Sequence, residues 1–316
     1  MLKVGLVGVG GISGAHIPVW DAMEGAVLTA LCDARESQLA PYADRHCYTD
    51  FSEMLEKEPL DILDICLPTE FHTDCAVCAM ERGIHVLCEK PVSFHEEDVD
   101  RLTTAAEKNH VHFMVAQVLR FWPEYVWLKS VYEKETYGKL LSGTMSRLSQ
   151  IPQWSFQNWM SDKKRSGLVP FDLHIHDLDF LVHAFGAPKN STVRRSCRPD
   201  QDYLCAVYDF DGFSVCTEAA WYAAPYPFSA SFRFQFEKAL VVYQNGVCTV
   251  YNAADGSVST LSPSSDLNTD AISIPKSDGY AAEIQYFADC VRQNKTPDKV
   301  PPAELKTVIR LLKELG

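Results

Sequence analysis

Three residues have the types that proton and hydride chemistry on an alcohol would need. Asp172 and His176 are four residues apart in a predicted helix, so both side chains lie on one face of it. Histidine titrates near neutral pH, which suits reversible transfer of a hydroxyl proton. Lys90 follows a predicted strand, where its cation could stabilise charge on the reacting oxygen. Such an oxidation also needs a nicotinamide to accept the hydride.

Each of these features also has a simpler explanation. An Asp–His pair at this spacing is commonly a surface or capping pair, and a lysine at the end of a strand is usually just solvated. His174 lies on the opposite helix face and is expected to be structural. His16 is expected to pack beside the glycine-rich turn described next.

The start of the chain predicts a dinucleotide-binding turn. The apolar run Val4–Val7 stops at glycine, and helical spacing of apolar residues follows. Gly8 permits the tight turn, Gly10 lets a pyrophosphate approach the backbone, and the helix start offers N–H groups to the anion. Ser13 replaces the usual third glycine. The residues expected to hold the pyrophosphate are Gly8, Gly10, Gly11 and Ile12.

An acidic residue lies at the spacing expected for a ribose contact. Asp33 follows a second apolar strand and is 33 − 10 = 23 residues beyond Gly10. A carboxylate there repels a 2′-phosphate, so NAD is favoured over NADP. Arg35 could weaken that preference by pairing with the phosphate. Alternatively, Asp33 only ends the strand and caps the next helix.

Strands and helices alternate through the first 120 residues. Nearly continuous apolar strands with helices between them predict a parallel, doubly wound sheet. Two polar segments, Pro68–His72 and Glu89–Pro91, follow such strands and therefore face the cofactor. Asp50 with Glu53, and Ser93 with Glu96, are predicted to cap helices.

Strands dominate after residue 120. Phe228 to Phe236 alternates apolar and polar residues, which is typical of a strand with one buried face. One long helix is predicted near 171–185, and two more near 279–293 and 302–315. We therefore expect domains at 1–120 and 121–316, the second an α+β domain with a mostly antiparallel open sheet. The stretch 254–278 is expected to be the least structured.

Composition excludes several classes of partner. The 316 residues are 47% hydrophobic and 22% charged, as in a globular protein, and the net charge is 29 − 42 = −13. Nucleic acid and anionic membranes are therefore poor partners. No apolar run is long enough to span a membrane, and the opening strand leaves no room for a signal peptide. The eleven cysteines lie mostly in apolar segments, which favours the reducing cytoplasm, and Cys75-x-x-Cys78 favours packing over a metal site.

Taken together, the motifs resemble the glucose-fructose oxidoreductase/inositol dehydrogenase/MocA (Gfo/Idh/MocA) family. The resemblance covers the whole chain, and Glu89-Lys90-Pro91 is its most specific mark. Two segments depart from the family pattern, Ser166–Pro170 and Ala116–Leu119. Both line the family's substrate pocket, so they bear on the substrate rather than on the chemistry.

The resemblance implies a Rossmann domain, a second domain that forms oligomers, and NAD(P)-dependent oxidation or reduction of a sugar or cyclitol. It implies a catalytic set of Lys90, Asp172 and His176, with no metal. Those three residues and Arg120 would bind substrate. Beyond the turn, the cofactor contacts would be Asp33, Arg35, Pro68, Thr69, His72, Glu89 and Lys90.

Other functions remain compatible with these residues. A lyase or hydrolase could oxidise a sugar hydroxyl transiently with bound NAD and cleave a glycosidic substituent without consuming added NAD. A non-catalytic NAD-binding sugar sensor is the third possibility, and the intact catalytic set argues against it. The open sheet of the second domain would leave an apolar face uncovered, which predicts a homodimer or homotetramer.

Overall fold

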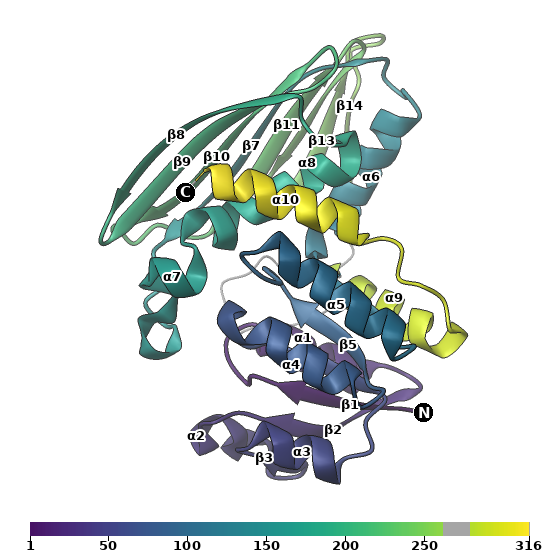
Figure 1. The fold of residues 1–316 in the computed structure, drawn as a ribbon. Helices are drawn as coiled ribbons and strands as arrows, with labels where there is room; N and C mark the ends of the chain where they lie inside the picture. Colours follow the sequence, from purple (N-terminus) through teal and green to yellow (C-terminus); the bar gives the residue numbers. More distant parts are fainter. Residues whose placement is uncertain (262–278, 316) are drawn as a thin grey trace. The chain divides into compact units, whose positions relative to one another are not determined.

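The computed structural model describes residues 1–261 and 279–315, which form two compact units (Figure 1). The first unit contains Met1–Val118 and Gly279–Ile309, and the second contains residues 119–261 and 310–315. We describe each unit separately.

Within the described residues, a six-stranded parallel sheet forms the centre of the first unit. Its strand order is β3-β2-β1-β4-β5-β6, which confirms the predicted doubly wound Rossmann arrangement. Val4–Val7 of the central strand β1 and all of β4 are buried, as expected for strands covered on both faces. The strands are β1 Leu2–Val7, β2 Ala26–Cys32, β3 His46–Tyr48, β4 Ile62–Ile65, β5 His85–Glu89 and β6 Phe113–Ala116.

Helices connect these strands and complete the unit. They are α1 Ser13–Ala22, α2 Glu36–Leu39, α3 Phe51–Lys57, α4 His72–Met80, α5 Glu96–Lys108 and α9 Gly279–Gln293, with short 3₁₀ turns η1 Ala40–Tyr42 and η2 Thr69–Phe71. The predicted cap of α3 is present, because the Asp50 carboxylate accepts the Glu53 N–H. The predicted cap of α5 is wrong. His95 is its N-cap residue and no side chain caps it, while the Ser93 hydroxyl accepts the His95 N–H at 3.1 Å and donates to the Asp98 carboxylate in the first turn.

The compact units differ from the sequence-based domains in where residues 279–309 belong. Residues 279–309 group with the first unit, although the boundary at 120 places them in the second. Side-chain contacts explain the grouping. The Tyr280 ring lies 5.9 Å from that of His16, and the Arg292 guanidinium donates to the Glu24 carbonyl at 2.8 Å. The last helix, α10 Pro302–Glu314, contributes residues to both units.

The second unit is built on a sheet of eight strands within the described part of the chain. The order is β14-β13-β12-β11-β7-β10-β9-β8, antiparallel except where β7 and β10 run parallel, which confirms the predicted α+β class. The strands are β7 Leu140–Gln150, β8 Asn190–Arg198, β9 Gln201–Asp209, β10 Ser214–Tyr222, β11 Ser229–Phe236, β12 Ala239–Gln244, β13 Val247–Asn252 and β14 Val258–Leu261. Residues 262–278 of the stretch expected to be unstructured lie outside the described residues.

An aromatic core joins one face of this sheet to its helices. The Tyr125 ring packs edge-on against Phe180 and Phe232, and Phe185 packs against Phe234. These rings come from α6, α8 and β11, so the inward positions of the alternating strand are filled as predicted. The helical segments are η3 Val118–Arg120, α6 Pro123–Glu133, η4 Phe156–Ser161, α7 Lys163–Ser166, the π-helix η5 Pro170–His174, and α8 Ile175–Phe185.

The opposite face of the sheet carries a mixed row of side chains. Strand register aligns Val207, Cys216, Thr144, Arg233 and Val242 across five neighbouring strands. Apart from Arg233, which is exposed, these side chains are half-buried. Larger rings on other rows reach solvent, with Tyr203 37% and Tyr251 46% exposed. We call this surface the outer face of the second sheet.

Candidate active site

The glycine turn after β1 fits a dinucleotide pyrophosphate. Gly8 has φ +93°, and a Cβ there would lie 2.6 Å from the Cys66 carbonyl oxygen, so only glycine fits. Nothing lies within 4 Å of a Cβ built on Gly10, which leaves its backbone open to a ligand. Among the described residues, no side chain caps the start of α1, and Ser13 Oγ bonds to the Gly10 carbonyl at 2.7 Å. The turn therefore combines an open backbone with an uncapped helix start.

The Asp33 carboxylate is already fully engaged. One oxygen accepts the Val9 N–H at 2.9 Å, which ties the end of β2 to the glycine turn. The Arg35 guanidinium binds both oxygens at 2.9 Å, and the Arg35 N–H adds a further bond. Hydrogen bonding to Asp33 raises the pKa of Arg35. Asp33, the predicted ribose contact, and Arg35, expected to weaken the preference for NAD, therefore form one ion pair. A ribose hydroxyl would compete with Arg35 for the Asp33 carboxylate.

Strand register brings the glycine turn and Lys90 to one edge of the sheet. Val7 pairs with Ile65, which in turn pairs with Cys88, so the carboxyl ends of β1, β4 and β5 lie at the same edge of the sheet. Ligands in such sheets bind at the carboxyl ends of the strands. Lys90 lies directly past β5, half-buried, at this edge.

The loop after β4 differs from its expected role in one respect. Pro68 is half-buried and Thr69 is 4% exposed, but the His72 ring is buried and contacts two backbone carbonyls. Its Nδ1 is 2.9 Å from the Pro91 oxygen and its Nε2 is 2.6 Å from the Leu67 oxygen. Burial lowers the pKa of His72, although the carbonyl contacts oppose the shift. His72 therefore connects the loops after β4 and β5 at this edge. From the sequence it was expected to contact the cofactor instead.

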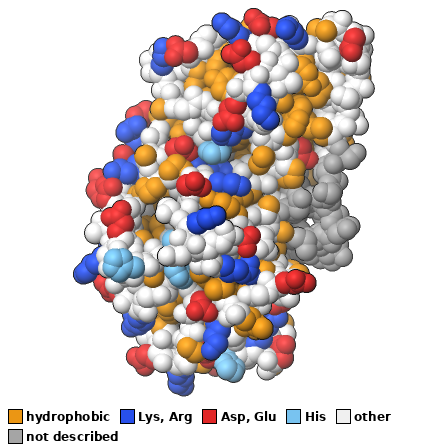
Figure 2. All heavy atoms as spheres, turned by 90° about the vertical axis from the view of Figure 1, so that its right-hand side faces the viewer, with side chains coloured by type: hydrophobic (Ala, Val, Ile, Leu, Met, Phe, Trp, Pro, Cys, Tyr) orange, Lys and Arg blue, Asp and Glu red, His pale blue; other side chains and the backbone are white. Residues whose placement is uncertain are grey.

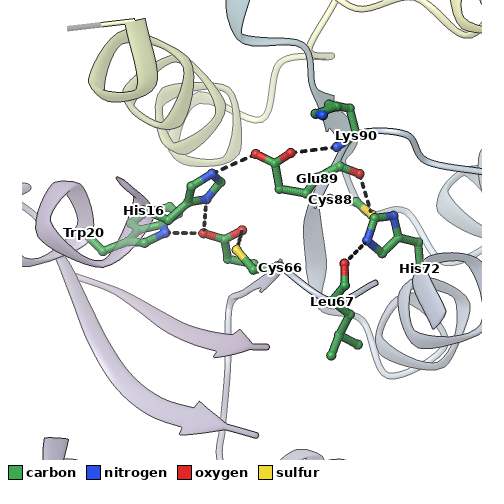
Figure 3. Close-up of polar contacts among 9 residues, drawn as sticks. His16, Trp20, Cys66, Leu67, His72, Cys88, Glu89 and Lys90 are labelled. Carbon is green, nitrogen blue, oxygen red and sulfur yellow. Dashed lines mark hydrogen bonds and ion pairs between the residues drawn. The ribbon is translucent and has the colours of Figure 1, made fainter. Parts of the chain in front are cut away.

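A buried polar cluster lies beneath the turn (Figure 3). His16 Nδ1 is 2.8 Å from Asp64 Oδ2, and its Nε2 is 3.1 Å from Glu89 Oε1. Trp20 Nε1 donates to the same Asp64 oxygen at 2.7 Å. Glu89 was expected to contact the cofactor, yet it is 5% exposed, and its second oxygen accepts the Lys90 N–H at 2.9 Å.

This cluster includes the described group of side chains that could ligate a metal, His16, Asp64 and Cys66. Their ligand atoms lie within 4.8 Å of one another. The Cys66 thiol contacts Asp64 at 3.7 Å, and burial raises its pKa to about 12, so it stays protonated. The two ring nitrogens of His16 both contact carboxylates. The atoms that could ligate a metal are thus already joined in a hydrogen-bond network.

In the second unit, Asp172 and His176 are the two accessible residues of an otherwise buried segment. Every other residue from Phe171 to Val182 is buried, whereas these two are half-buried. Asp172 lies in the π-helix and His176 in the first turn of α8. Single π-turns inside helices are frequent at functional sites. Both polar side chains therefore remain partly open to solvent within this buried segment.

The backbone leading into this helix is held in an uncommon conformation. Gly167 and Leu168 have φ +71° and +60°, and a Cβ on Gly167 would lie 2.5 Å from the Phe171 ring. The Val169 N–H donates to Asp202 at 3.1 Å, and Asp202 is itself paired with Arg195. The segment Ser166–Pro170 departs from the family's Gly-rich run, but it keeps a glycine, Gly167, at the position where the turn requires one.

Arg120 is placed differently from the expected substrate contact. Its Nε is 2.8 Å from Asp179 Oδ2 and its Nη2 is 2.6 Å from Asp179 Oδ1. The Arg120 side chain is 0% exposed. A buried guanidinium needs a partner charge of this kind, so Arg120 fixes α8 from within. No pattern in the sequence indicated Asp179 as its partner.

Sequence reasoning also missed the partners of His16. The available signal was a carboxylate, Asp64, within the apolar strand Leu60–Leu67, because a charge inside a buried strand needs a partner. Glu89 gave no comparable signal, since it lies at a strand end where polar residues are common.

Comparison with known families decides the affiliation. Residues 2–117 match the model described as oxidoreductase family, NAD-binding Rossmann fold, and residues 125–242 match the GFO/IDH/MocA C-terminal domain. The chain belongs to the Gfo/Idh/MocA family. Its first unit is therefore the NAD-binding Rossmann domain of a family of oxidoreductases.

Several Gfo/Idh/MocA relatives have named activities. D-apiose dehydrogenase from Paraburkholderia graminis is 28% identical over 188 residues, 58% of this chain and 50% of that protein. Myo-inositol 2-dehydrogenase from Thermotoga maritima is 27% identical over 189 residues, 58% and 55% of the two chains. 2,7-anhydro-N-acetylneuraminate hydratase from Mediterraneibacter gnavus is 27% identical over 189 residues, 59% and 50%. These alignments span about half the length of the relatives.

Solved structures share the complete fold. Levoglucosan dehydrogenase in complex with NADH and levoglucosan superimposes with a TM-score of 0.84 at 19% identity, covering 99% of this chain and 96% of that one. An oxidoreductase from Agrobacterium radiobacter in complex with NAD⁺, L-tartaric acid and magnesium gives 0.85 at 19% identity, covering 99% and 95%. At this identity the likeness concerns the fold.

The face of the molecule drawn in Figure 2 carries charges of both signs. Figure 2 shows acidic and basic side chains interspersed with hydrophobic ones over the face that it draws. In the described parts of the chain, no helix has the length and apolar character needed to cross a bilayer.

Proposed function

We propose that this protein is an NAD-dependent dehydrogenase that moves a hydride between nicotinamide and a secondary hydroxyl of a sugar, sugar derivative or inositol. The observation that carries the proposal is the shared sheet edge. The Gly8 turn, Asp33 and Lys90 follow three strands of one parallel sheet at their carboxyl ends. Relatives named D-apiose dehydrogenase and myo-inositol 2-dehydrogenase support the class of substrate.

The cofactor contacts in this proposal come from the first unit. Gly8, Gly10, Gly11 and Ile12 hold the pyrophosphate, Asp33 with Arg35 selects the ribose, and Pro68 and Thr69 flank the site. NAD supplies the hydride acceptor when bound. The open backbone at Gly10 and the uncapped start of α1 support this fit.

The reacting hydroxyl needs a proton acceptor and a stabilising charge. We assign His176 as the base that takes the proton, and Asp172 as the carboxylate that orients the substrate or the base. Lys90 is assigned to the developing charge on the oxygen. The accessibility of Asp172 and His176 on a buried helix supports these roles, and the burial of Arg120 argues against its direct contact with substrate.

The test is absorbance at the reduced-nicotinamide band with a panel of sugars and cyclitols, with NAD added and omitted. A dehydrogenase gives NADH in proportion to substrate consumed, and the Lys90→Ala variant serves as the inactive control. Binding of NAD and sugar without any turnover would contradict the proposal and indicate a sensor.

A second candidate is a lyase or hydratase that recycles bound NAD. The relative named 2,7-anhydro-N-acetylneuraminate hydratase favours it. The same panel separates the two, because this enzyme would convert its sugar without net NADH and without added NAD. The free thiols of all eleven cysteines fit either enzyme in a reducing compartment, for which we propose the cytoplasm.

A further inference from the structure

We propose that His16 is a positioning residue for Lys90 and acts on it through the carboxylate of Glu89. The part of this inference that concerns turnover rests on the proposed function. The part that concerns geometry does not, because all the groups belong to the first unit and can be observed without substrate.

A continuous line of contacts joins the two residues (Figure 3). His16 Nε2 is 3.1 Å from Glu89 Oε1, and the other oxygen of that carboxylate accepts the Lys90 N–H at 2.9 Å. The carboxylate therefore spans a side chain from α1 and the backbone of the residue that follows β5. Fixing one oxygen fixes the direction of the other, since the group is rigid and planar.

Burial makes this arrangement depend on His16. The His16 and Asp64 side chains are 0% exposed and that of Glu89 is 7% exposed. Two carboxylates so placed repel each other unless a cation lies between them. Burial alone would lower the pKa of His16, but the charge and hydrogen bond of Asp64 outweigh it and raise the pKa well above its ordinary value. A protonated His16 thus places a positive charge between the two carboxylates.

Lys90 needs such support because it lies beyond the sheet. The ladder of β5 with β6 ends at the pair Glu89 and Ala116, so no strand pairing fixes the next residue. On its other side, the Pro91 carbonyl is 2.9 Å from His72 Nδ1. The residues before and after Lys90 are therefore each held by a histidine from elsewhere in the unit.

Trp20 provides a matched control in the same cluster. It donates to Asp64 at 2.7 Å, on the side of His16 away from Glu89. Replacing it with phenylalanine removes a buried hydrogen bond without touching the Glu89–Lys90 contact. If the variants only lose stability, Trp20→Phe and His16→Gln should behave alike. If His16 positions Lys90, only His16→Gln should change the environment of the Lys90 amide.

The first measurement is hydrogen exchange of the Lys90 amide in the full-length protein, with and without NAD. Pro91 has no amide proton, so the Lys90 signal is not blurred by its neighbour. Exchange should be slow in the unmodified protein and in Trp20→Phe, and faster in His16→Gln and Glu89→Ala. Glu89→Gln should restore protection, because its amide oxygen can still accept the Lys90 N–H.

The second measurement is steady-state turnover with a substrate found in the panel. We expect His16→Gln and Glu89→Ala to lower kcat by about 10- to 100-fold, the usual effect of removing a supporting hydrogen bond, with KM and NAD affinity nearly unchanged. Glu89→Gln should regain most of the kcat lost in Glu89→Ala. The double variant His16→Gln/Glu89→Ala should be no slower than the worse single one, because the two residues act as a unit.

The outcomes separate the two proposals. Unchanged Lys90 exchange in His16→Gln overturns the inference, and so does normal kcat in that variant. If His16→Gln fails to fold, equal exchange and turnover in Glu89→Ala and the unmodified protein overturn it instead. If exchange behaves as expected but no sugar is turned over, the positioning holds and the proposed function fails.

Discussion

Arg120 and Asp179 form a two-point ion pair that is closed to solvent. Both carboxylate oxygens bind the guanidinium, and the two side chains are 0% and 1% exposed. The pair ties η3 to α8, the helix that carries His176. It therefore contributes to the placement of a proposed catalytic residue without facing substrate.

Removing one partner of this pair should be costly for stability. Arg120→Met leaves a buried carboxylate without its cation, and we expect it to lower the free energy of unfolding by about 3–5 kcal/mol. The double variant Arg120→Met/Asp179→Leu should regain most of that loss. Urea unfolding checks both. A fully stable Arg120→Met protein with a raised KM would instead restore the role in substrate binding.

Loss of the proposed base or the proposed cation should slow the reaction more than it weakens NAD binding. His176→Ala should lower turnover by about 10²–10⁴-fold, the usual weight of general acid–base catalysis. Lys90→Ala should lose a comparable amount. NAD affinity should stay near normal, since the pyrophosphate and ribose contacts lie elsewhere. Near-normal turnover in either variant would remove that residue from the catalytic set.

Cofactor preference should depend on the Asp33–Arg35 pair. NAD should bind more tightly than NADP, because the carboxylate repels a 2′-phosphate. Asp33→Ala should reduce this difference in affinity. Arg35→Ala should widen it, since the guanidinium that neutralises the carboxylate is lost. Fluorescence titration with both reduced cofactors measures this. Equal affinities in the unmodified protein would contradict the prediction.

Stability should fall in acid partly because of His174. Burial and the nearby charge of Arg147 lower the pKa of His174 from 6.5 to about 3. Below pH 6.5 the unfolded chain binds a proton that the folded protein excludes, so this residue costs stability progressively from pH 6.5 down to about 3. Above pH 6.5 it costs nothing. His174→Gln should flatten the dependence of unfolding free energy on pH in that window, and an unchanged slope would refute the assignment.

The outer face of the second sheet predicts self-association. Its half-buried row of Val207, Cys216 and Val242 offers apolar contact area for another copy of the chain. Light scattering at micromolar concentration should show a dimer or tetramer. Val207→Glu should dissociate it, whereas Lys57→Glu, at an exposed position in the first unit, should not. A monomeric unmodified protein would rule out the prediction.

Local signals predicted most of the elements. The apolar run before Gly8 and the alternation of Phe228 to Phe236 correspond to β1 and β11 within a few residues. The edge strands β3 and β14 were not predicted, because they are short and polar and depend on pairing rather than on their own sequence. The Ser93 cap failed because the helix begins later than predicted, with His95 as its N-cap, and the Ser93 oxygen accepts the His95 N–H instead.

The polar partnerships were beyond sequence reasoning. His16 meets partners 48 and 73 positions away, and Arg120 meets Asp179 at a separation of 59. Nothing in the spacing of a single chain records such pairs. Asp172 and His176, which are half-buried, were singled out by their local spacing, and their role stays a prediction. The burial of Arg120, His72 and Glu89 was not predicted, since it depends on which distant elements cover them.

The discontinuity of the first unit has a consequence for how the protein is made. Met1–Val118 emerges from the ribosome early. The contacts of Tyr280 with His16 and of Arg292 with Glu24, however, require a segment that is synthesised after all the described strands of the second sheet. Until that segment is made, one side of α1 in the nascent Rossmann domain is therefore uncovered. Folding of the first unit can finish only once residues 279–309 have been synthesised, so a chain stalled or cut before residue 279 should display the uncovered side of α1 to chaperones.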